Sequence, residues 1–319
     1  DCSSGRFDGD ATAGGRASIR MSRSFLVVGP SFRFLSGISV YTCRLANALA
    51  ANHKVGVLLL DRLIPAKLYP GGDRVGDNLT ALDYDPSVRR FGQIDWFWFP
   101  RIIPAIWRLV RNRPDVMVLQ WWTAAVLHTY LLLALVAKVL RIDVVIEFHE
   151  AQDTGEAEVP GVAAYARLCT PLLLRMADGA LVHNEHDREL LRQTYGGKRI
   201  DRLELEVAPH GPYDHMSVAE QPVRDANDQV TRLLCFGLIR PYKGTEDAVV
   251  ALDLMSPEDA ADFHLAVVGE TWENWDLPAE KIAASKYRDR IDFVNRYVTD
   301  EEAANYFAST APILTRCSP

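Results

Sequence analysis

Two basic residues lie on one short, glycine-containing loop, residues 237–245, which carries Arg240 and Lys243. The apolar run before it, 233–236, predicts a buried strand, and residues 246–255 have apolar side chains at helical spacing. The free N–H groups and dipole of a helix N-terminus attract an anion, and two cations strengthen that attraction. A diphosphate fits such a loop. The alternative is that both residues are ordinary solvated loop charges.

A histidine and a glutamate follow another predicted strand. His149 and Glu150 come soon after the apolar residues 144–146. Ligands of parallel sheets bind beyond the carboxyl ends of the strands, so these two residues are site candidates. A lone histidine more often has a structural role, and that alternative stays open. His183 and His210 share the strand-end position, with weaker individual support.

Two tryptophans end a further predicted strand. Trp121 and Trp122 follow the apolar residues 116–119. Aromatic faces at the rim of a site stack on sugars or on apolar acceptors, and they equally cover the edge of a core. We therefore treat both residues as candidates for acceptor binding, with core packing as the alternative.

The elements that position these residues alternate between strand and helix, which predicts an α/β fold with parallel sheets. We expect strands at 25–29, 55–60, 116–119, 143–148, 179–183, 233–236, 263–268, 291–294 and from 313, and helices at 38–51, 124–140, 162–176, 184–191, 246–255 and 301–308. Both halves open with strand, glycine-containing loop and helix, as two Rossmann-like domains do.

The domain boundaries follow from composition. Residues 1–20 are rich in Gly, Ala, Ser and Asp, and we expect a disordered extension there. Proline, glycine and charged residues near 208–228 mark a junction. We therefore predict an N-terminal Rossmann-like domain over 21–210 and a partial C-terminal one over 211–319.

Composition narrows the class of protein. The 319 residues are 48% hydrophobic and 24% charged, which is ordinary for a globular protein, and the net charge of −7 argues against a general nucleic-acid binder. The five cysteines are scattered without a CxxC pair, so they suggest neither a disulfide framework nor a zinc site, and a reducing cytoplasm fits them best.

Two apolar stretches raise the question of membrane contact. Residues 124–140 are interrupted by polar side chains and are short for a bilayer span, which favours a buried helix. The stretch from Trp96 to Arg113 mixes aromatic residues with four arginines, as interfacial helices do. The favoured alternative is a domain helix with an apolar face on the sheet and a solvated arginine face.

The loop with the two cations resembles the donor loop of GT-B-fold glycosyltransferases of the family-4 type. In those enzymes the basic residues of this loop bind the pyrophosphate of a sugar nucleotide. The resemblance assigns that role to Arg240 and Lys243, and places Gly237 and Gly244 at the donor.

Other positions match the same family. The resemblance places His149 near the transferring sugar, with Glu150 orienting it or contacting the acceptor, and Gly37 facing the donor. The residues that the resemblance places around the sugar, phosphates and base of the donor are Glu270, Tyr297 and Val298.

The resemblance implies a retaining transfer from a UDP-, GDP- or ADP-sugar, with no bound metal or other cofactor. The N-terminal domain would hold a glycan, lipid-linked or small-molecule acceptor, in the cytoplasm or at the inner face of the membrane. Relatives continue beyond the last residues of this chain, so we expect a truncated second domain and impaired activity.

Three other functions remain open. A nicotinamide-dependent oxidoreductase is disfavoured because the first loop, 29–39, lacks the GxGxxG fingerprint. A non-catalytic sugar-nucleotide-binding protein would bind the donor without turning it over. A peripheral membrane scaffold would bind anionic vesicles through residues 96–113 and ignore nucleotides.

Overall fold

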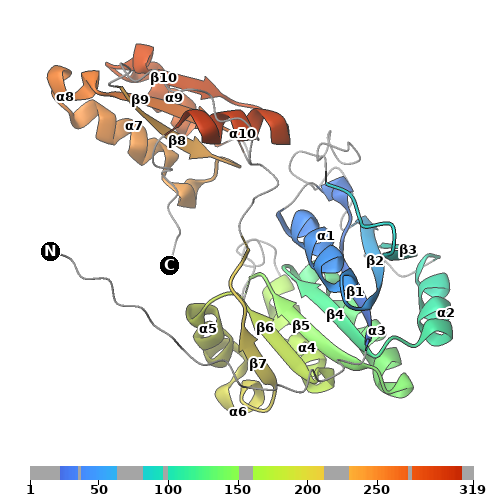
Figure 1. Ribbon diagram of the computed structural model, residues 1–319. Helices are drawn as coiled ribbons and strands as arrows, with labels where there is room; N and C mark the ends of the chain where they lie inside the picture. The colour runs from blue at the N-terminus through green and yellow to red at the C-terminus, as the bar shows by residue number, and fades with distance from the viewer. Residues whose placement is uncertain are drawn as a thin grey trace, which may run out of the picture.

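The computed structural model describes residues 22–34, 37–62, 82–95, 100–150, 161–211, 230–271 and 275–310 (Figure 1). These residues form two parallel sheets, one of seven strands and one of three, each accompanied by helices. The predicted α/β class with parallel sheets is confirmed. The expected extension at 1–20 and the strand expected from 313 lie outside the described residues.

The larger sheet has the strand order β3-β2-β1-β4-β5-β6-β7. Its strands are β1 (Ser24–Pro30), β2 (Lys54–Arg62), β3 (Arg89–Asp95), β4 (Val116–Trp121), β5 (Asp143–Phe148), β6 (Gly179–Val182) and β7 (Glu204–Val207). Its helices are α1 (Gly37–Ala50), α2 (Ile102–Asn112), α3 (Leu127–Leu140), α4 (Val162–Met176), α5 (Glu185–Tyr195) and α6 (Gly197–Ile200), with short 3-10 turns η1 (Phe32–Phe34) and η4 (Ala124–Val126).

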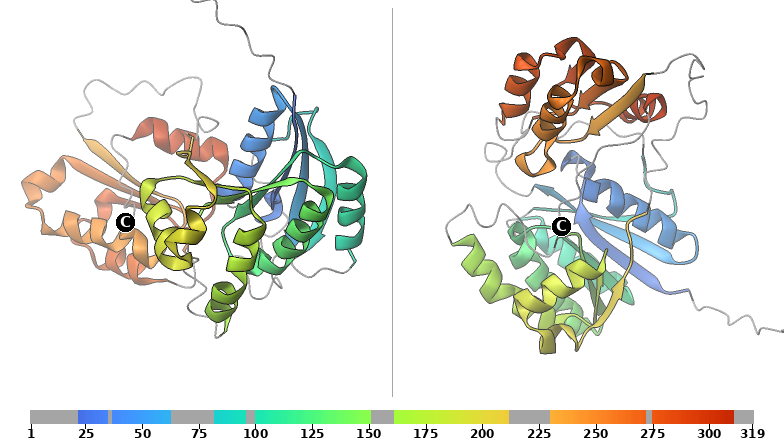
Figure 2. Two further views of the ribbon diagram at one scale, coloured as in Figure 1. Left: turned by 90° about the horizontal axis from the view of Figure 1, so that it is seen from below. Right: turned by 90° about the vertical axis from the view of Figure 1, so that its left-hand side faces the viewer.

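Side-chain alternation along β1 gives this sheet two different faces. Leu26 and Val28 belong to the main core, which α2, α3 and α4 cover. Val27 points the other way, into a smaller core with Cys43 of α1. The views in Figure 2 show α2, α3 and α4 side by side in one layer. None of the described helices is long and apolar enough to cross a bilayer.

The smaller sheet has the order β10-β9-β8. It consists of β8 (Thr231–Phe236), β9 (Phe263–Val268) and β10 (Ile291–Val294), with α7 (Thr245–Leu254), α8 (Pro257–Ala261), α9 (Leu277–Ala284), α10 (Asp300–Ser309) and the 3-10 turns η7 (Pro241–Lys243) and η8 (Arg288–Arg290). It also has a core on each face, one built with α7 and α9 and one with α10. Every described strand of the larger sheet lies at or before Val207, and every described strand of the smaller sheet lies at or after Thr231.

Capping residues explain the helix ends that the sequence predicts best. The Asn184 side chain accepts a hydrogen bond from the Asp187 N–H and starts α5, and Gly196 ends it. Thr299 and Glu302 form a capping box at α10. The sequence analysis missed β3, β7, α6, α8 and α9, and the 124–140 helix begins with the η4 turn. These missed elements are short or polar on one side, so their hydrophobic period is weak.

Candidate active site

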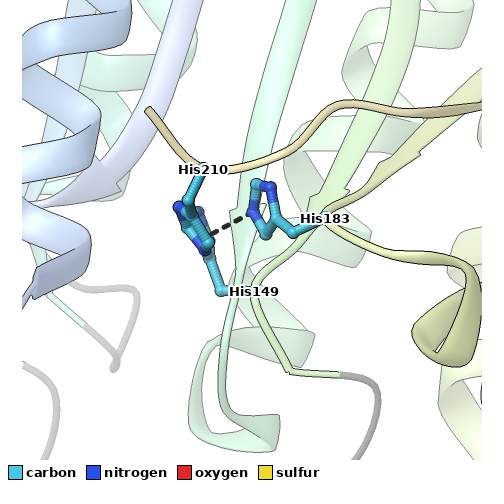
Figure 3. Close-up of side chains that lie close together, drawn as sticks. All are labelled: His149, His183 and His210. Atoms are coloured by element: carbon cyan, nitrogen blue, oxygen red, sulfur yellow. Dashed lines mark hydrogen bonds between the residues drawn. The ribbon is translucent and has the colours of Figure 1, made fainter. Parts of the chain in front are cut away.

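His149 and His183 become neighbours because of strand register. In the parallel pairing of β5 with β6, Phe148 lies opposite Val182, so the next residue of each strand is a histidine. In the pairing of β6 with β7, Val182 lies opposite Val207. The chain leaving β7 then returns His210 to the same place (Figure 3). Three histidines far apart in sequence thus gather at the carboxyl edge of the sheet.

A buried hydrogen-bond chain holds the His149 ring. Tyr41 of α1 donates to Glu147 Oε1 at 2.5 Å, and Gln120 Nε2 donates to Glu147 Oε2 at 2.7 Å. Gln120 Oε1 lies 2.5 Å from His149 Nε2. Gln120 and Glu147 are 0% and 1% exposed. Gln120 therefore orients His149, and Glu150, which the sequence analysis expected to orient His149 or to contact the acceptor, is exposed.

The other two histidines pack on the first. His183 Nε2 lies 3.1 Å from His149 Nδ1, and His183 Nδ1 lies 2.8 Å from the Ala208 carbonyl oxygen. The exposed His210 ring stacks on His183 with centroids 3.6 Å apart. The Tyr41 ring makes edge-to-face contacts with all three imidazoles, with centroid distances of 4.8, 5.4 and 5.0 Å. Both ring nitrogens of His149 thus contact protein groups.

This environment keeps the imidazoles of His149 and His210 neutral at pH 7. Burial, together with the neighbouring His183 and His210, lowers the pKa of His149 to about 2. Burial and the adjacent His183 lower the pKa of His210 to about 4. Burial and the Glu147 carboxylate raise the pKa of the Tyr41 hydroxyl above its ordinary value. At neutral pH His149 and His210 therefore offer lone pairs, and Tyr41 keeps its proton.

A second polar network lies at the ends of β2 and β3. The carboxylate of Asp61, 2% exposed, pairs with Arg33 at 3.3 Å and with Arg101 at 3.1 Å. Arg101 also reaches Asp95, 3% exposed, at 3.5 Å, and Ser31 donates to Asp61. The sequence analysis did not single out these residues, since no local motif joins a serine, two aspartates and two arginines from separate strand ends.

The loop with the two cations is built on glycines in unusual backbone conformations. Gly237 has φ of +105° and Gly244 has φ of +63°, the left-handed region that favours glycine. Gly244 directly precedes Thr245, the first residue of α7, so the loop delivers the chain to a helix N-terminus. Parallel pairing continues past β8, because Ile239 N–H donates to Glu270 O at 2.9 Å. The predicted strand, loop and helix are confirmed.

The two cations are held close to one another. Lys243 ends the η7 turn, and its ammonium lies 3.2 Å from where a Cβ on Gly237 would stand. Burial and the nearby Arg240 lower the pKa of Lys243. Like charges that are brought together and partly desolvated repel, so this arrangement favours an anion as a bound partner.

The other predicted site residues differ in whether their side chains are accessible to a ligand or enclosed in the core. Gly37 is exposed at the first residue of α1, and Glu270 and Tyr297 are half-buried at the ends of β9 and β10. Trp121 is 1% exposed and packs against Phe148, so its faces are not available to an acceptor and core packing is its role. Trp122 packs on the same core but stays partly exposed, and Val298 is a core residue at 6% exposure.

The histidine cluster is the part of the site that sequence reasoning underestimated. Considered alone, His183 and His210 each have weak support from their neighbours in the sequence. The signal that identifies them is their common position one to three residues beyond consecutive parallel strands, which places them at one edge. No such signal identifies Gln120, Glu147 and Tyr41. Each lies inside a strand or helix, and packing decides which way its side chain points.

Solved structures share this fold. The catalytic domain of starch synthase IV from Arabidopsis thaliana, bound to ADP and acarbose, matches with a TM-score of 0.59 and 10% identity, covering 92% of this chain and 78% of that chain. An E. coli structure described as trehalose-6-phosphate bound with UDP-2-fluoro glucose matches with a TM-score of 0.57 and 10% identity, covering 91% and 77%. An α,α-trehalose-phosphate synthase (UDP-forming) from Burkholderia vietnamiensis has a TM-score of 0.53 and 13% identity, covering 91% and 75%.

At these identities the matches establish the GT-B fold and no more. No curated protein sequence is significantly similar to the chain. The sequence profile of the family described as Glycosyl transferase 4-like domain matches residues 36–211, which is more than half of the chain and contains the histidine cluster. The chain therefore belongs to the glycosyl transferase 4-like family of glycosyltransferases.

Proposed function

We propose that this glycosyltransferase transfers a sugar from a nucleotide-sugar donor to an acceptor with retention of configuration, and that the loop around Arg240 and Lys243 binds the donor diphosphate. The observation that carries the proposal is the pair of adjacent cations on a glycine turn that leads into α7. Similar structures contain UDP-2-fluoro glucose or ADP, which supports a nucleoside diphosphate as the ligand.

The proposed chemistry is stabilisation of the leaving group. When the bond between the sugar and the diphosphate breaks, negative charge grows on the departing oxygen. Arg240, Lys243 and the N–H groups at the start of α7 would stabilise that charge, and they are already in place before it appears. Removing a preorganised donor of this kind costs about 100- to 1,000-fold in rate.

The N-terminal domain, 21–210, would then bind the acceptor, and residues 211–319 the donor. In this proposal His149 lies beside the transferring sugar, and Glu150 and Trp122 contact the acceptor. The support is that these residues follow β4 and β5 at the carboxyl edge, where ligands of parallel sheets bind. Gly37, Glu270 and Tyr297 would contact the donor.

Calorimetry with UDP, GDP and ADP tests the donor site on the full chain and on Arg240→Ala/Lys243→Ala. We expect one nucleotide to bind and the double variant to lose binding. Lys281→Ala/Arg288→Ala is a matched control, because it removes two exposed charges near the smaller sheet, on α9 and on the turn before β10. Equal binding by both double variants would contradict the proposed donor loop.

Binding without turnover would favour the non-catalytic alternative. The decisive measurement is release of free nucleoside diphosphate from the donor whose base calorimetry identifies, with and without candidate acceptors. Nucleotide binding combined with no release under any acceptor would identify a sugar-nucleotide-binding protein of this family.

A further proposal concerns the place of the acceptor, since the outer surface of α2, α3 and α4 suits an anionic membrane. On α2, Ile102, Ala105 and Leu109 are buried, as the domain-helix interpretation predicts. The exposed large apolar residues of this layer are Ile103, Trp107, Val110, Leu135, Val139, Leu168 and Leu172.

The charged side chains of these three helices are all basic, and one of them, Lys138, pairs with Asp178 at 2.7 Å. The three helices contain no aspartate or glutamate, although the chain as a whole has a net charge of −7. Their basic residues are Arg108, Arg111, Lys138, Arg167 and Arg175. Apolar side chains that enter the interface, flanked by cations, are typical of peripheral contact with anionic lipid. Such contact fits a lipid-linked acceptor. Residues 96–99, which begin the stretch that the sequence analysis considered for membrane contact, lie outside the described part of the chain.

Vesicle co-sedimentation tests this contact. We expect binding to phosphatidylglycerol vesicles, weaker binding to neutral phosphatidylcholine, and loss of binding in Trp107→Glu/Leu168→Glu. Leu254→Glu is the control, because Leu254 is 82% exposed on α7, away from this layer. Undiminished vesicle binding by Trp107→Glu/Leu168→Glu would contradict this surface.

A further inference from the structure

The positions of two protons in the histidine cluster follow from their neighbours. Gln120 Nε2 donates to Glu147, so the atom that faces His149 Nε2 at 2.5 Å is the amide oxygen. An amide oxygen only accepts, so His149 Nε2 carries a hydrogen. His183 Nδ1 lies 2.8 Å from the Ala208 carbonyl oxygen and carries a hydrogen for the same reason.

The two remaining nitrogens, His149 Nδ1 and His183 Nε2, face each other at 3.1 Å. In neutral imidazoles each of these atoms bears a lone pair and no hydrogen. Two lone pairs at this distance repel unless a cation lies between them or beside them. That cation is either a shared proton or a metal ion.

We propose that His149, His183 and His210 together bind a divalent transition-metal ion, with Zn²⁺ as the prototype. One nitrogen from each of the three residues lies within 4.8 Å of the others. Tetrahedral Zn²⁺ with bonds of 2.0–2.1 Å separates its ligand nitrogens by about 3.3 Å, close to the distance between His149 and His183. His210 stands beside the other two rings (Figure 3). It is exposed, so rotation of its side chain would bring the third nitrogen to the ion.

The surroundings match those of metal-binding histidines elsewhere. Such histidines donate their second N–H to a carboxylate, a backbone carbonyl or water, which fixes the ring. Here the side-chain amide oxygen of Gln120, which is held by Glu147, accepts from His149. The Ala208 carbonyl oxygen accepts from His183. Neutral imidazole is a good ligand for Zn²⁺, Co²⁺, Ni²⁺ and Cu²⁺. A metal ion also accounts for the third ring, His210, whereas a proton shared between His149 and His183 does not involve it.

A consequence for activity rests on the proposed function. Because His149 is also the residue proposed beside the transferring sugar, an ion held by its Nδ1 would occupy space that the sugar needs. Zn²⁺ would then inhibit transfer. The ion is thus a regulatory or inhibitory ligand of this site and takes no part in the reaction that we propose.

Titration of the full chain with Co²⁺ alone, after chelator treatment, tests the site without any sugar nucleotide. We expect one Co²⁺ per chain with visible d–d absorption, displaced by Zn²⁺. His183→Ala and His210→Ala should each weaken binding at least about tenfold, in line with the cost of disturbing a metal centre. The control His186→Ala, an exposed histidine on α5, should bind as the wild type does.

The other outcomes are distinguishable. Wild-type protein that binds no Co²⁺, or variants that bind it unchanged, would overturn the proposal, as would thiolate charge-transfer bands that indicate a cysteine site. A shared proton, seen as a slowly exchanging imidazole N–H in apo protein together with absent metal binding, would also overturn it. Arg240→Ala/Lys243→Ala should retain Co²⁺ binding, so failure of the donor-site proposal and failure of the metal proposal give different results.

Discussion

The Cα of Gly269 faces the backbone of Gly237, and a Cβ added to Gly269 would lie 2.0 Å from the Gly237 carbonyl oxygen. Gly269 has φ of +148°, Gly237 N–H donates to Val268 O, and Gly269 N–H donates to Val294 O. The two glycines therefore let the ends of β8 and β9 approach each other closely. This approach positions the loop that carries Arg240 and Lys243.

Gly269→Ala should displace that loop. We expect a loss of about 2–3 kcal/mol in the free energy of unfolding, from the backbone clash and the positive φ together, and a clear loss of nucleotide binding. Urea denaturation and calorimetry measure the two effects.

Gly196→Ala separates conformational strain from the clash. Gly196 also has a positive φ, +91°, but a Cβ there would meet no atom within 4 Å. Only about 1 kcal/mol should be lost, with nucleotide binding intact. Equal destabilisation by both substitutions would show that contact between the two glycines is unimportant.

Tyr41→Phe should loosen the support of His149. The substitution removes one hydrogen bond to the buried Glu147 carboxylate, and bonds to charged groups contribute about 1.5–3 kcal/mol. We expect that loss in unfolding free energy, together with lower transferase activity. Tyr84→Phe, at a buried tyrosine in the same half of the chain, controls for loss of a hydroxyl group. Activity of Tyr41→Phe equal to that of Tyr84→Phe would contradict a positioning role.

Asp61→Asn tests the network of arginines at the ends of β2 and β3. Asp61 is buried and pairs with both Arg33 and Arg101, so neutralising it removes the carboxylate that pairs with Arg33 and leaves Arg101 with Asp95. Breaking a buried pair is costly, and we expect about 2–3 kcal/mol because both arginines still reach water.

The matched control is Asp83→Asn. Asp83 pairs with Arg90, and both side chains are exposed, so the loss should stay below about 1 kcal/mol. Chemical denaturation of both variants at one ionic strength gives the comparison. A cost for Asp61→Asn as small as that for Asp83→Asn would mean that the network adds no stability.

The capping box of α10 should make stability sensitive to acid. The Arg296 side chain and the Thr299 N–H lower the pKa of Glu302 from an ordinary 4.5 to about 2 in the folded protein. Because the folded pKa is the lower one, the contribution is fully present above about pH 4.5 and is lost as the pH falls toward 2.

Glu302→Gln should therefore flatten the fall in the urea midpoint between pH 4.5 and 2. Glu301→Gln removes a charge from the same helical turn without touching the capping box, and should leave the slope as in the wild type. Parallel slopes for Glu302→Gln and the wild type would show that the capping box does not contribute to the acid response.

Local sequence patterns were sufficient to predict the strands, helices and caps that depend on residues close together along the chain. The apolar runs 143–148 and 263–268 match β5 and β9 to the residue, and residues 162–176 match α4. The N-cap at Asn184 and the capping box at Thr299 are also local. The glycine loop around Arg240 belongs to the same class, because strand, turn and helix follow one another without a break.

Only the tertiary structure decided which way each side chain faces and how the strands align with one another. Trp121 and Trp122 are adjacent and of one residue type, yet one is enclosed in the core and the other is partly exposed. His149, His183 and His210 meet because three parallel strands end at one edge in matching register. Sequence alone thus determined the α/β class, the order of most elements and the loop with two cations, since these follow from hydrophobic period and turn chemistry. The histidine cluster and its support by Gln120, Glu147 and Tyr41 depend on long-range packing, which no local pattern encodes.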